Sequence, residues 1–296
     1  MNAWTRSSQA IILNSTISSE PSPHNKKGIS TMRLLSALLL FALATTAQAQ
    51  LATPNPAGLT YGHVHLNVVD MDRHKEIWVE HFNGVVVEKG PLTAVRLPNM
   101  LVALTEKEPT LAMQETIMDH FGFKVRNMET FLDKWRADGL EVGRVFIGAE
   151  GQTNAYVMLP GNVYVEMQED QGLSEEITGY HIHFISPDYE EMLAWYTDIF
   201  SLEVKPRGSI QTTTNAPGMN ISFGNSTSPR LPTRGAALDH IGFEFDDLEA
   251  FCNELTAKGI VFDVPYRDIP AIGLKIAFIT DPWGGYIELT EGYDEF

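Results

Sequence analysis

The chain repeats one pattern of alternating apolar and polar positions four times. Apolar side chains take every second position after a shared histidine, which is the periodicity of a strand with one buried face. The histidine lies on the opposite face in each copy. The shared histidines are 57, 61 and 59 residues apart, counted along positions 63, 120, 181 and 240. The copies begin Tyr61-Gly-His63-Val-His65-Leu, Met118-Asp-His120-Phe-Gly122-Phe, Gly179-Tyr-His181-Ile-His183-Phe and Leu238-Asp-His240-Ile-Gly242-Phe.

An amphipathic helix is predicted after each of these strands. Asp, Asn or Ser at its start can accept hydrogen bonds from free backbone amides. Aromatic residues such as Trp78 and Phe82 recur at helical spacing and are expected to pack against the sheet. Short apolar segments separated by turns then predict three strands, and a proline precedes the last of them. The predicted helices cover 70–82, 127–137, 186–200 and 246–258.

Each repeat is therefore a βαβββ module, and the chain is predicted to be an α+β protein. The helix covers one face of each sheet, so two modules can close into an open β-cup lined by the histidine-bearing face. We expect consecutive modules to pair, which gives two domains. The modules are expected at 58–110 and 115–170 in a first domain, 58–172, and at 177–228 and 236–292 in a second domain, 176–296.

A glutamate occurs in the last strand of modules two and four. Glu166 and Glu288 each lie six residues beyond a proline, and a tyrosine, Tyr164 or Tyr286, lies two positions earlier on the same face. The last strands of modules one and three carry no carboxylate there. Pairing of consecutive modules predicts one set in each half: His63, His120 and Glu166, then His181, His240 and Glu288.

Two imidazoles and one carboxylate on adjacent strands form a facial triad that leaves coordination positions open. That arrangement suits non-haem Fe(II) or Mn(II), and the same ligands can bind zinc. The alternative is structural: a histidine at a strand start is often a satisfied core or surface residue, and a glutamate near a strand end is often solvated. The fourfold recurrence of histidine and the twofold recurrence of glutamate favour metal binding.

At these residues the sequence resembles the vicinal oxygen chelate superfamily, which contains glyoxalase I, extradiol dioxygenases, and fosfomycin and bleomycin resistance proteins. The most recognisable motif is Thr280-Asp-Pro-Trp-Gly-Gly-Tyr-Ile-Glu288-Leu. The resemblance implies paired βαβββ modules that chelate a divalent metal from first and last strands. Ala103 and Ser222 replace the further glutamate of a glyoxalase-type site. The ligand number and the four-module layout resemble the extradiol dioxygenases.

The leading hypothesis is a metal-dependent enzyme that acts on a small molecule with vicinal oxygens, most simply an Fe(II) dioxygenase of extradiol type. The alternatives are a lyase or isomerase of glyoxalase type and a ligand-binding protein of resistance type without catalysis. Fe(II) is the favoured metal, and Mn, Zn or Ni also fit the ligands. His65 and His183 are candidate acid/base or substrate-orienting groups, or structural histidines. Tyr164 and Tyr286 are candidate donors to a metal-bound oxyanion.

The start of the chain resembles an export signal. Met32-Arg33 precedes a short apolar run over 34–43 and the small-x-small sequence Ala47-Gln-Ala49. We expect a signal peptide at 32–49, a mature chain from Gln50, and a periplasmic or secreted protein. Residues 1–31 are then a disordered extension, or the true start of the protein is Met32 rather than Met1.

The net charge narrows the partner classes. The chain carries 21 basic and 38 acidic residues, a net charge of −17. Such a surface repels phosphate backbones and anionic lipid, so we expect a small-molecule substrate, no nucleic acid, and no membrane association after cleavage. A monomer and a homodimer are both compatible with the sequence. The single cysteine, Cys252, excludes an intrachain disulfide and makes a cysteine-based zinc site improbable.

Overall fold

The computed structural model describes residues 51–295, which contain the four predicted modules in chain order. The predicted signal peptide at 32–49, the start at Gln50 and the extension at 1–31 lie outside these residues. Within 51–295, no helix is both long and apolar enough to cross a membrane.

Modules one, two and four follow the predicted order of elements, and module three has one strand fewer. A short 3-10 turn, η1 (Met113–Glu115), leads into module two. Module one contains β1 (Leu59–Val68), α2 (Met71–Phe82), β2 (Val85–Lys89), β3 (Leu92–Leu97) and β4 (Met100–Glu106); module two contains β5 (Met118–Val125), α3 (Met128–Ala137), β6 (Glu141–Ile147), β7 (Thr153–Leu159) and β8 (Val163–Glu169). Module three contains β9 (Ile177–Ile185), α4 (Tyr189–Ile199), β10 (Thr213–Ala216) and β11 (Met219–Gly224); module four contains β12 (Leu238–Phe245), α5 (Leu248–Ala257), β13 (Phe262–Ile269), β14 (Leu274–Thr280) and β15 (Tyr286–Glu291).

The helix caps follow the predicted chemistry, with small shifts. The side chains of Asp70 and Asn127 accept hydrogen bonds from backbone amides three residues later, at the starts of α2 and α3. The third and fourth helices start later than predicted. Asp188 rather than Ser186 is the N-cap of α4, and Asp247 rather than Asp246 caps α5 and accepts from Ala250 N.

Module three departs from the βαβββ pattern after its helix. In place of a strand paired along its length, the segment 201–212 makes isolated bridges from Val204 to Thr214 and from Arg207 to Ile210. Pro206 has no amide hydrogen for a sheet ladder, and Gly208 adopts a positive φ of 54°. This segment is therefore a loop, and it directs a charged residue, Arg207, into the interior.

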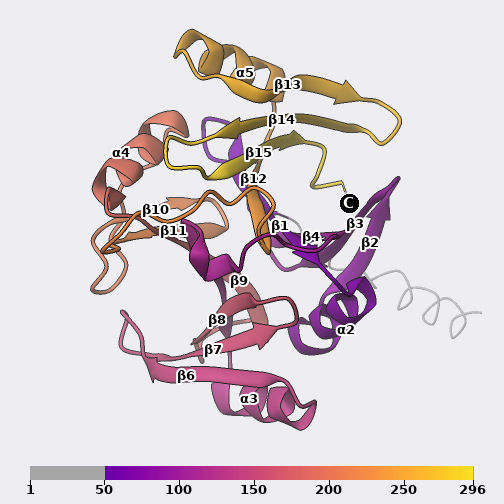
Figure 1. Cartoon of the computed structure of the whole chain (residues 1–296), viewed down its shortest axis with the longest axis vertical. Helices are drawn as coiled ribbons and strands as arrows, with labels where there is room; N and C mark the ends of the chain where they lie inside the picture. Colours follow the sequence, from indigo (N-terminus) through magenta and orange to yellow (C-terminus); the bar gives the residue numbers. More distant parts are fainter. Residues whose placement is uncertain (1–50, 296) are drawn as a thin grey trace, which may run out of the picture. The chain divides into compact units, whose positions relative to one another are not determined.

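The modules pair across the two halves of the chain rather than in succession. One sheet has the strand order β13-β14-β15-β12-β1-β4-β3-β2, and the other has the order β10-β11-β9-β5-β8-β7-β6. The antiparallel partners are β1 with β12 and β5 with β9. Figure 1 shows β12 of module four beside β1 of module one. The predicted pairing of consecutive modules is wrong. Modules one and four form the one–four sheet, and modules two and three form the two–three sheet.

Consecutive modules nevertheless share a hydrophobic core through their helices. The ring of Trp78 in α2 lies 5.9 Å from that of Phe123 in β5, between centroids. Phe200, at the end of α4, lies 4.4 Å from Phe243 in β12. Helices α2 and α4 thus pack against both their own module and the next one, while the sheets connect the two halves. Neither half of the chain is a self-contained domain in this arrangement.

The last residues of the chain are held against the one–four sheet by a buried carboxyl group. Glu244 accepts hydrogen bonds from the backbone amides of Gly292 and Tyr293 and from the hydroxyl of Thr290. Burial raises the pKa of Glu244 to about 7, against smaller opposing effects of these hydrogen bonds. The carboxyl group is therefore partly protonated near neutral pH.

Glu244→Gln is expected to gain stability relative to wild type as pH rises. Because the pKa of Glu244 is higher in the folded chain than in the unfolded chain, wild type loses stability from about pH 4.5 to about pH 7. The difference between variant and wild type should grow by about 2–3 kcal/mol between pH 5 and pH 8. Urea unfolding at several pH values measures it, with the exposed Glu254→Gln as control. A difference that stays constant with pH would contradict the assignment.

Candidate metal centres

The one–four sheet brings together two histidines and a glutamate, which we call the one–four centre. His63 comes from β1, His240 from β12 and Glu288 from β15, and all three are buried. The Nε2 atoms of His63 and His240 lie 2.9 Å and 3.0 Å from the same carboxylate oxygen, Oε2 of Glu288. Two imidazoles therefore converge on one carboxylate oxygen.

The two–three sheet repeats this arrangement, and we call the second group the two–three centre. His120 comes from β5, Glu166 from β8 and His181 from β9, and all three are buried. The Nε2 atoms of His120 and His181 lie 2.8 Å and 3.4 Å from Oε2 of Glu166.

The sequence identified all six of these residues but grouped them incorrectly. His63 lies with His240 and Glu288, not with His120 and Glu166; His181 lies with His120 and Glu166. The exchange follows from the pairing of the modules. In each centre, one module contributes a histidine and a glutamate, and its sheet partner contributes a single histidine.

Two aspartates that the sequence analysis did not single out orient the histidines. Oδ1 of Asp119 lies 2.8 Å from Nδ1 of His120, and Oδ1 of Asp239 lies 2.6 Å from Nδ1 of His240. A carboxylate on Nδ1 holds the proton there and directs the Nε2 lone pair toward the centre. The Asp-His pair that recurs in modules two and four was the available signal.

The histidines that contact these aspartates have raised pKa values. Burial lowers the pKa of His240, but hydrogen bonds with Asp239 and Glu288 outweigh burial and raise it to about 9. Asp119 and Glu166 act in the same way on His120, whose pKa is also about 9. Both imidazoles therefore lie in a region of negative electrostatic potential, which also favours a bound cation.

The donor atoms fit a divalent metal ion. Nε2 of His120 and both ring nitrogens of His181 are buried, and Oε2 of Glu166 lies close to the two Nε2 atoms in a geometry that does not complete a hydrogen bond. Such orphaned nitrogens are costly unless something else binds them. Together with a carboxylate oxygen they form a nitrogen and oxygen donor set of the kind that binds iron, manganese or zinc.

Two glycines leave space for the histidine rings contributed by the partner modules. A Cβ added to Gly242 would lie 1.9 Å from Cε1 of His63, and one added to Gly122 would lie 2.3 Å from Cε1 of His181. These glycines stand where modules one and three have His65 and His183. The histidine of one module therefore lies over the glycine of the other.

The strand registers locate the position where a fourth ligand could stand. Glu166 and Glu288 pair with Gly122 and Gly242 in the parallel ladders of modules two and four. The corresponding ladders of modules one and three pair His65 with Ala103 and His183 with Ser222. Ala103 and Ser222 thus occupy the positions equivalent to the glutamates, as predicted. Neither side chain is a carboxylate, so each centre has three ligands of the predicted kind.

The four further candidate residues lie beside the centres. The rings of His65 and His183 lie 4.6 Å from His240 and 5.0 Å from His120, and His65 also contacts the hydroxyl of Thr105 at 2.7 Å. Burial is the main cause that lowers the pKa of both, to about 3 for His65. The tyrosines flank the ligand histidines edge-on: Tyr164 lies 6.3 Å from His120, and Tyr286 lies 5.6 Å from His240.

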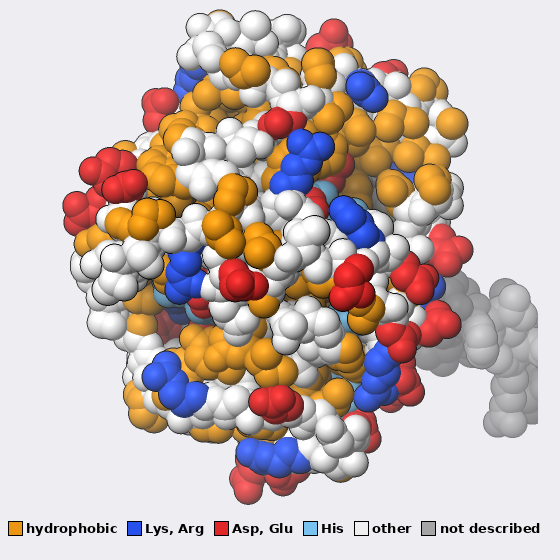
Figure 2. Space-filling view, in the orientation of Figure 1, with side chains coloured by type: hydrophobic (Ala, Val, Ile, Leu, Met, Phe, Trp, Pro, Cys, Tyr) orange, Lys and Arg blue, Asp and Glu red, His pale blue; other side chains and the backbone are white. Residues whose placement is uncertain are grey.

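The surroundings of the two centres differ. A cavity of about 290 Å³ reaches the two–three centre, and its walls include Asn154, Glu166, His183 and Arg207. At the one–four centre the ring of Tyr293 stacks on His63 at 4.4 Å. Figure 2 shows histidine surface in recesses between other side chains rather than on protruding ones. Tyr293 itself belongs to a small buried cluster with Ala94, Leu101, Ala103 and Leu274.

Comparison with known proteins gives a family match for the second half of the chain. Residues 180–289 match the Glyoxalase/Bleomycin resistance protein/Dioxygenase superfamily. This match covers most of modules three and four, so the second half of the chain is similar to this superfamily. Its members, the vicinal oxygen chelate proteins, are usually enzymes that bind a divalent metal, and the two centres have residues that could hold one. No curated protein sequence matches the chain.

Solved structures show the same fold over most of the chain. Glyoxalase I from Zea mays is 16% identical with a TM-score of 0.64, and the match covers 80% of this chain and 94% of that one. A putative dioxygenase from Bacillus subtilis is 10% identical with a TM-score of 0.62, covering 82% and 86%. At these identities the likeness establishes the fold and leaves the reaction to be argued from the centres.

Proposed function

We propose that the chain is a metal-dependent enzyme that acts on a small substrate with vicinal oxygens, and that the reaction is a dioxygenation. The observation that carries the proposal is the ligand set. Two histidines and one glutamate converge in each centre, while Ala103 or Ser222 stands at the fourth position. A three-ligand site of this type, holding Fe(II), leaves places for both a chelating substrate and dioxygen.

The two–three centre is the proposed catalytic one. His120, His181 and Glu166 would hold the metal, and Asp119 would keep His120 in the ligating tautomer. Its cavity gives a substrate access, whereas Tyr293 stacks on a ligand histidine of the one–four centre. The one–four centre is then a second metal site, and we assign no reaction to it.

The chain's own residues would orient the substrate within this cavity. His183 and Tyr156 both line it, close to Glu166. Their ring nitrogen and hydroxyl group can form hydrogen bonds with the hydroxyl groups of a bound diol. Orientation of this kind contributes to rate because the reacting atoms are held together before reaction.

The test is metal content together with oxygen uptake, on protein purified without oxygen. We expect nearly two Fe or Mn ions per chain and uptake of oxygen with aromatic vicinal diols. Glu166→Ala should abolish the uptake, whereas Glu288→Ala should retain it while losing one ion.

Other outcomes would replace the proposal. Bound zinc or nickel without oxygen uptake, together with isomerisation of a thiohemiacetal, would identify a glyoxalase-type enzyme. No metal, even after reconstitution, would contradict metal-dependent catalysis and favour a ligand-binding protein.

A further inference from the structure

Arg207 is a buried cation whose partners in the described residues are all neutral. Only 8% of its surface is exposed. Its guanidinium donates to Oε1 of Gln168 at 3.1 Å and to Oγ of Ser222 at 3.4 Å, and it lies 5.2 Å from the ring centroid of Tyr180. Its Nε is buried without a partner. No carboxylate of residues 51–295 forms an ion pair with it.

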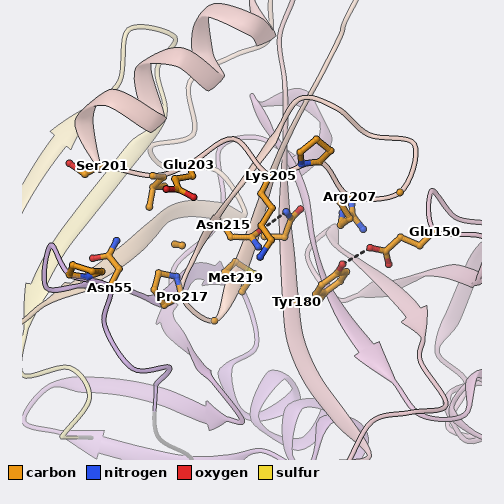
Figure 3. A pocket seen from close by; sticks show the side chains of 17 residues that line it. Asn55, Glu150, Tyr180, Ser201, Glu203, Lys205, Arg207, Asn215, Pro217 and Met219 are labelled. Atoms are coloured by element: carbon orange, nitrogen blue, oxygen red, sulfur yellow. Dashed lines mark hydrogen bonds between the residues drawn. The ribbon is translucent and has the colours of Figure 1, made fainter.

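The carboxylate of Glu150, which lines a cavity together with Arg207, is already engaged elsewhere. Glu150 accepts a hydrogen bond from the hydroxyl of Tyr180 at 2.8 Å and another, through its second oxygen, from the amide of Gln168. Figure 3 shows the bond between Tyr180 and Glu150, with Arg207 extending toward Tyr180. Burial of a charge without an opposite charge is costly, and native proteins usually compensate it. Arg207 is therefore a place where an anion would be stabilised.

This cation faces the two–three centre. Arg207 lines the same cavity of about 290 Å³ as Glu166 and His183, and it also lines an outer cavity of about 860 Å³. An anion on Arg207 would thus lie in the cavity that reaches the proposed metal site.

The local fold holds Arg207 in this position. Its backbone forms two hydrogen bonds with Ile210, both at 2.9 Å, which close a tight turn. The amide of Ser209 donates to the carbonyl of Ala149 in module two at 3.0 Å. The loop that replaces a strand in module three is thereby fixed against module two.

Among the described residues, the one–four centre replaces these polar side chains with smaller or apolar ones. Asn154 and Gln168 pair in β7 and β8, and the corresponding pair in β14 and β15 is Ile276 and Thr290. Ser222, which contacts Arg207, corresponds to Ala103. The polar residues around Arg207 therefore belong to the two–three centre specifically, which indicates a role in recognition rather than in the fold that both sheets share.

We propose that Arg207 binds a carboxylate of the substrate, so that the substrate is a vicinal-oxygen compound that also carries an acid group. A guanidinium can bind a carboxylate through two parallel hydrogen bonds, and one guanidinium balances one negative charge. This inference rests on the proposed function for the vicinal oxygens. The carboxylate site itself requires no metal.

Binding of matched probes tests the inference. Calorimetry would compare 3,4-dihydroxybenzoate with catechol on the metal-loaded chain, and benzoate with phenol on the chelator-treated chain. In wild type we expect each carboxylate to bind about 10–100-fold more tightly than its neutral partner, the range for a hydrogen bond to a charged group. Arg207→Met should remove the preference and Arg207→Lys should retain part of it. Arg267→Met, on the exposed edge strand β13, should leave it unchanged.

Equal affinity of wild type for the charged and neutral probes would overturn the proposal without any variant, so it stays testable even if Arg207→Met does not fold. A preference that survives in folded Arg207→Met would also overturn it. The two proposals fail separately. Benzoate selectivity in a chain that binds no metal would retain the carboxylate site and reject the metal enzyme. Metal binding and oxygen uptake without carboxylate selectivity would retain the metal enzyme and reject the carboxylate site.

Discussion

The double variant His63→Ala/Glu166→Ala is expected to bind no metal ion, whereas His63→Ala/Glu288→Ala should retain one. His63 and Glu288 belong to the same centre, so their loss damages one site, while His63 and Glu166 belong to different centres. Each centre has only three predicted ligands, so removal of one leaves too few for tight binding. Elemental analysis after desalting counts the ions, with nearly two expected in wild type.

The same pair of variants distinguishes the two ways of pairing the modules. If consecutive modules formed the centres, His63→Ala/Glu166→Ala would retain one ion and His63→Ala/Glu288→Ala would retain none. The two ways of pairing the modules therefore predict opposite metal contents for the two double variants. Glu254→Ala, an exposed change on α5, is the control for any effect of purification on metal content.

The sequence predicted the modules well because its signals are local. Strand alternation, helix caps and prolines act over a few residues, and each reports on its own stretch of backbone. The same alternation placed His63, His120, His181 and His240 on the face away from the helices. Their burial beside Glu166 and Glu288 agrees with that placement.

These local patterns do not determine which two modules pair through their first strands. β1, β5, β9 and β12 carry nearly the same pattern, so any of them presents a suitable edge to any other. Gly122 and Gly242 carried the missing information. Each must lie beneath a histidine ring of another module, but the sequence does not show which. Arg207 was missed for a different reason: it lies in a loop where periodicity has no meaning.

The fold ties both centres to the integrity of the whole chain. Helices α2 and α4 join consecutive modules through a shared core, and the sheets join module one to four and module two to three. Each half of the sequence thus contributes ligands to both centres. The first half contains eight strands and the second half contains seven, but neither half holds a complete ligand set. Neither centre can therefore be assembled from one half of one chain.

Gly242→Ala and Gly122→Ala are each expected to eliminate metal binding at one centre and to spare the other. The added Cβ would lie 1.9 Å from Cε1 of His63 in the first variant and 2.3 Å from Cε1 of His181 in the second. Real carbon atoms require about 3.5 Å or more, so the ligand ring must move by an ångström or more. The loss should be at least the 10–100-fold reduction in affinity that follows misorientation of a metal ligand.

Metal titration of each variant measures this loss, and the melting temperature separates it from unfolding. Gly172→Ala is the matched control, because its added Cβ would meet only Oδ1 of Asp170, at 3.3 Å. The pattern across variants is the decisive result. Gly242→Ala combined with His63→Ala should lose no more metal than either change alone, since both act on the one–four centre. Gly242→Ala combined with His181→Ala should lose both ions. Wild-type affinity at both centres in a folded Gly242→Ala chain would show that His63 does not ligate from the position it occupies over that glycine.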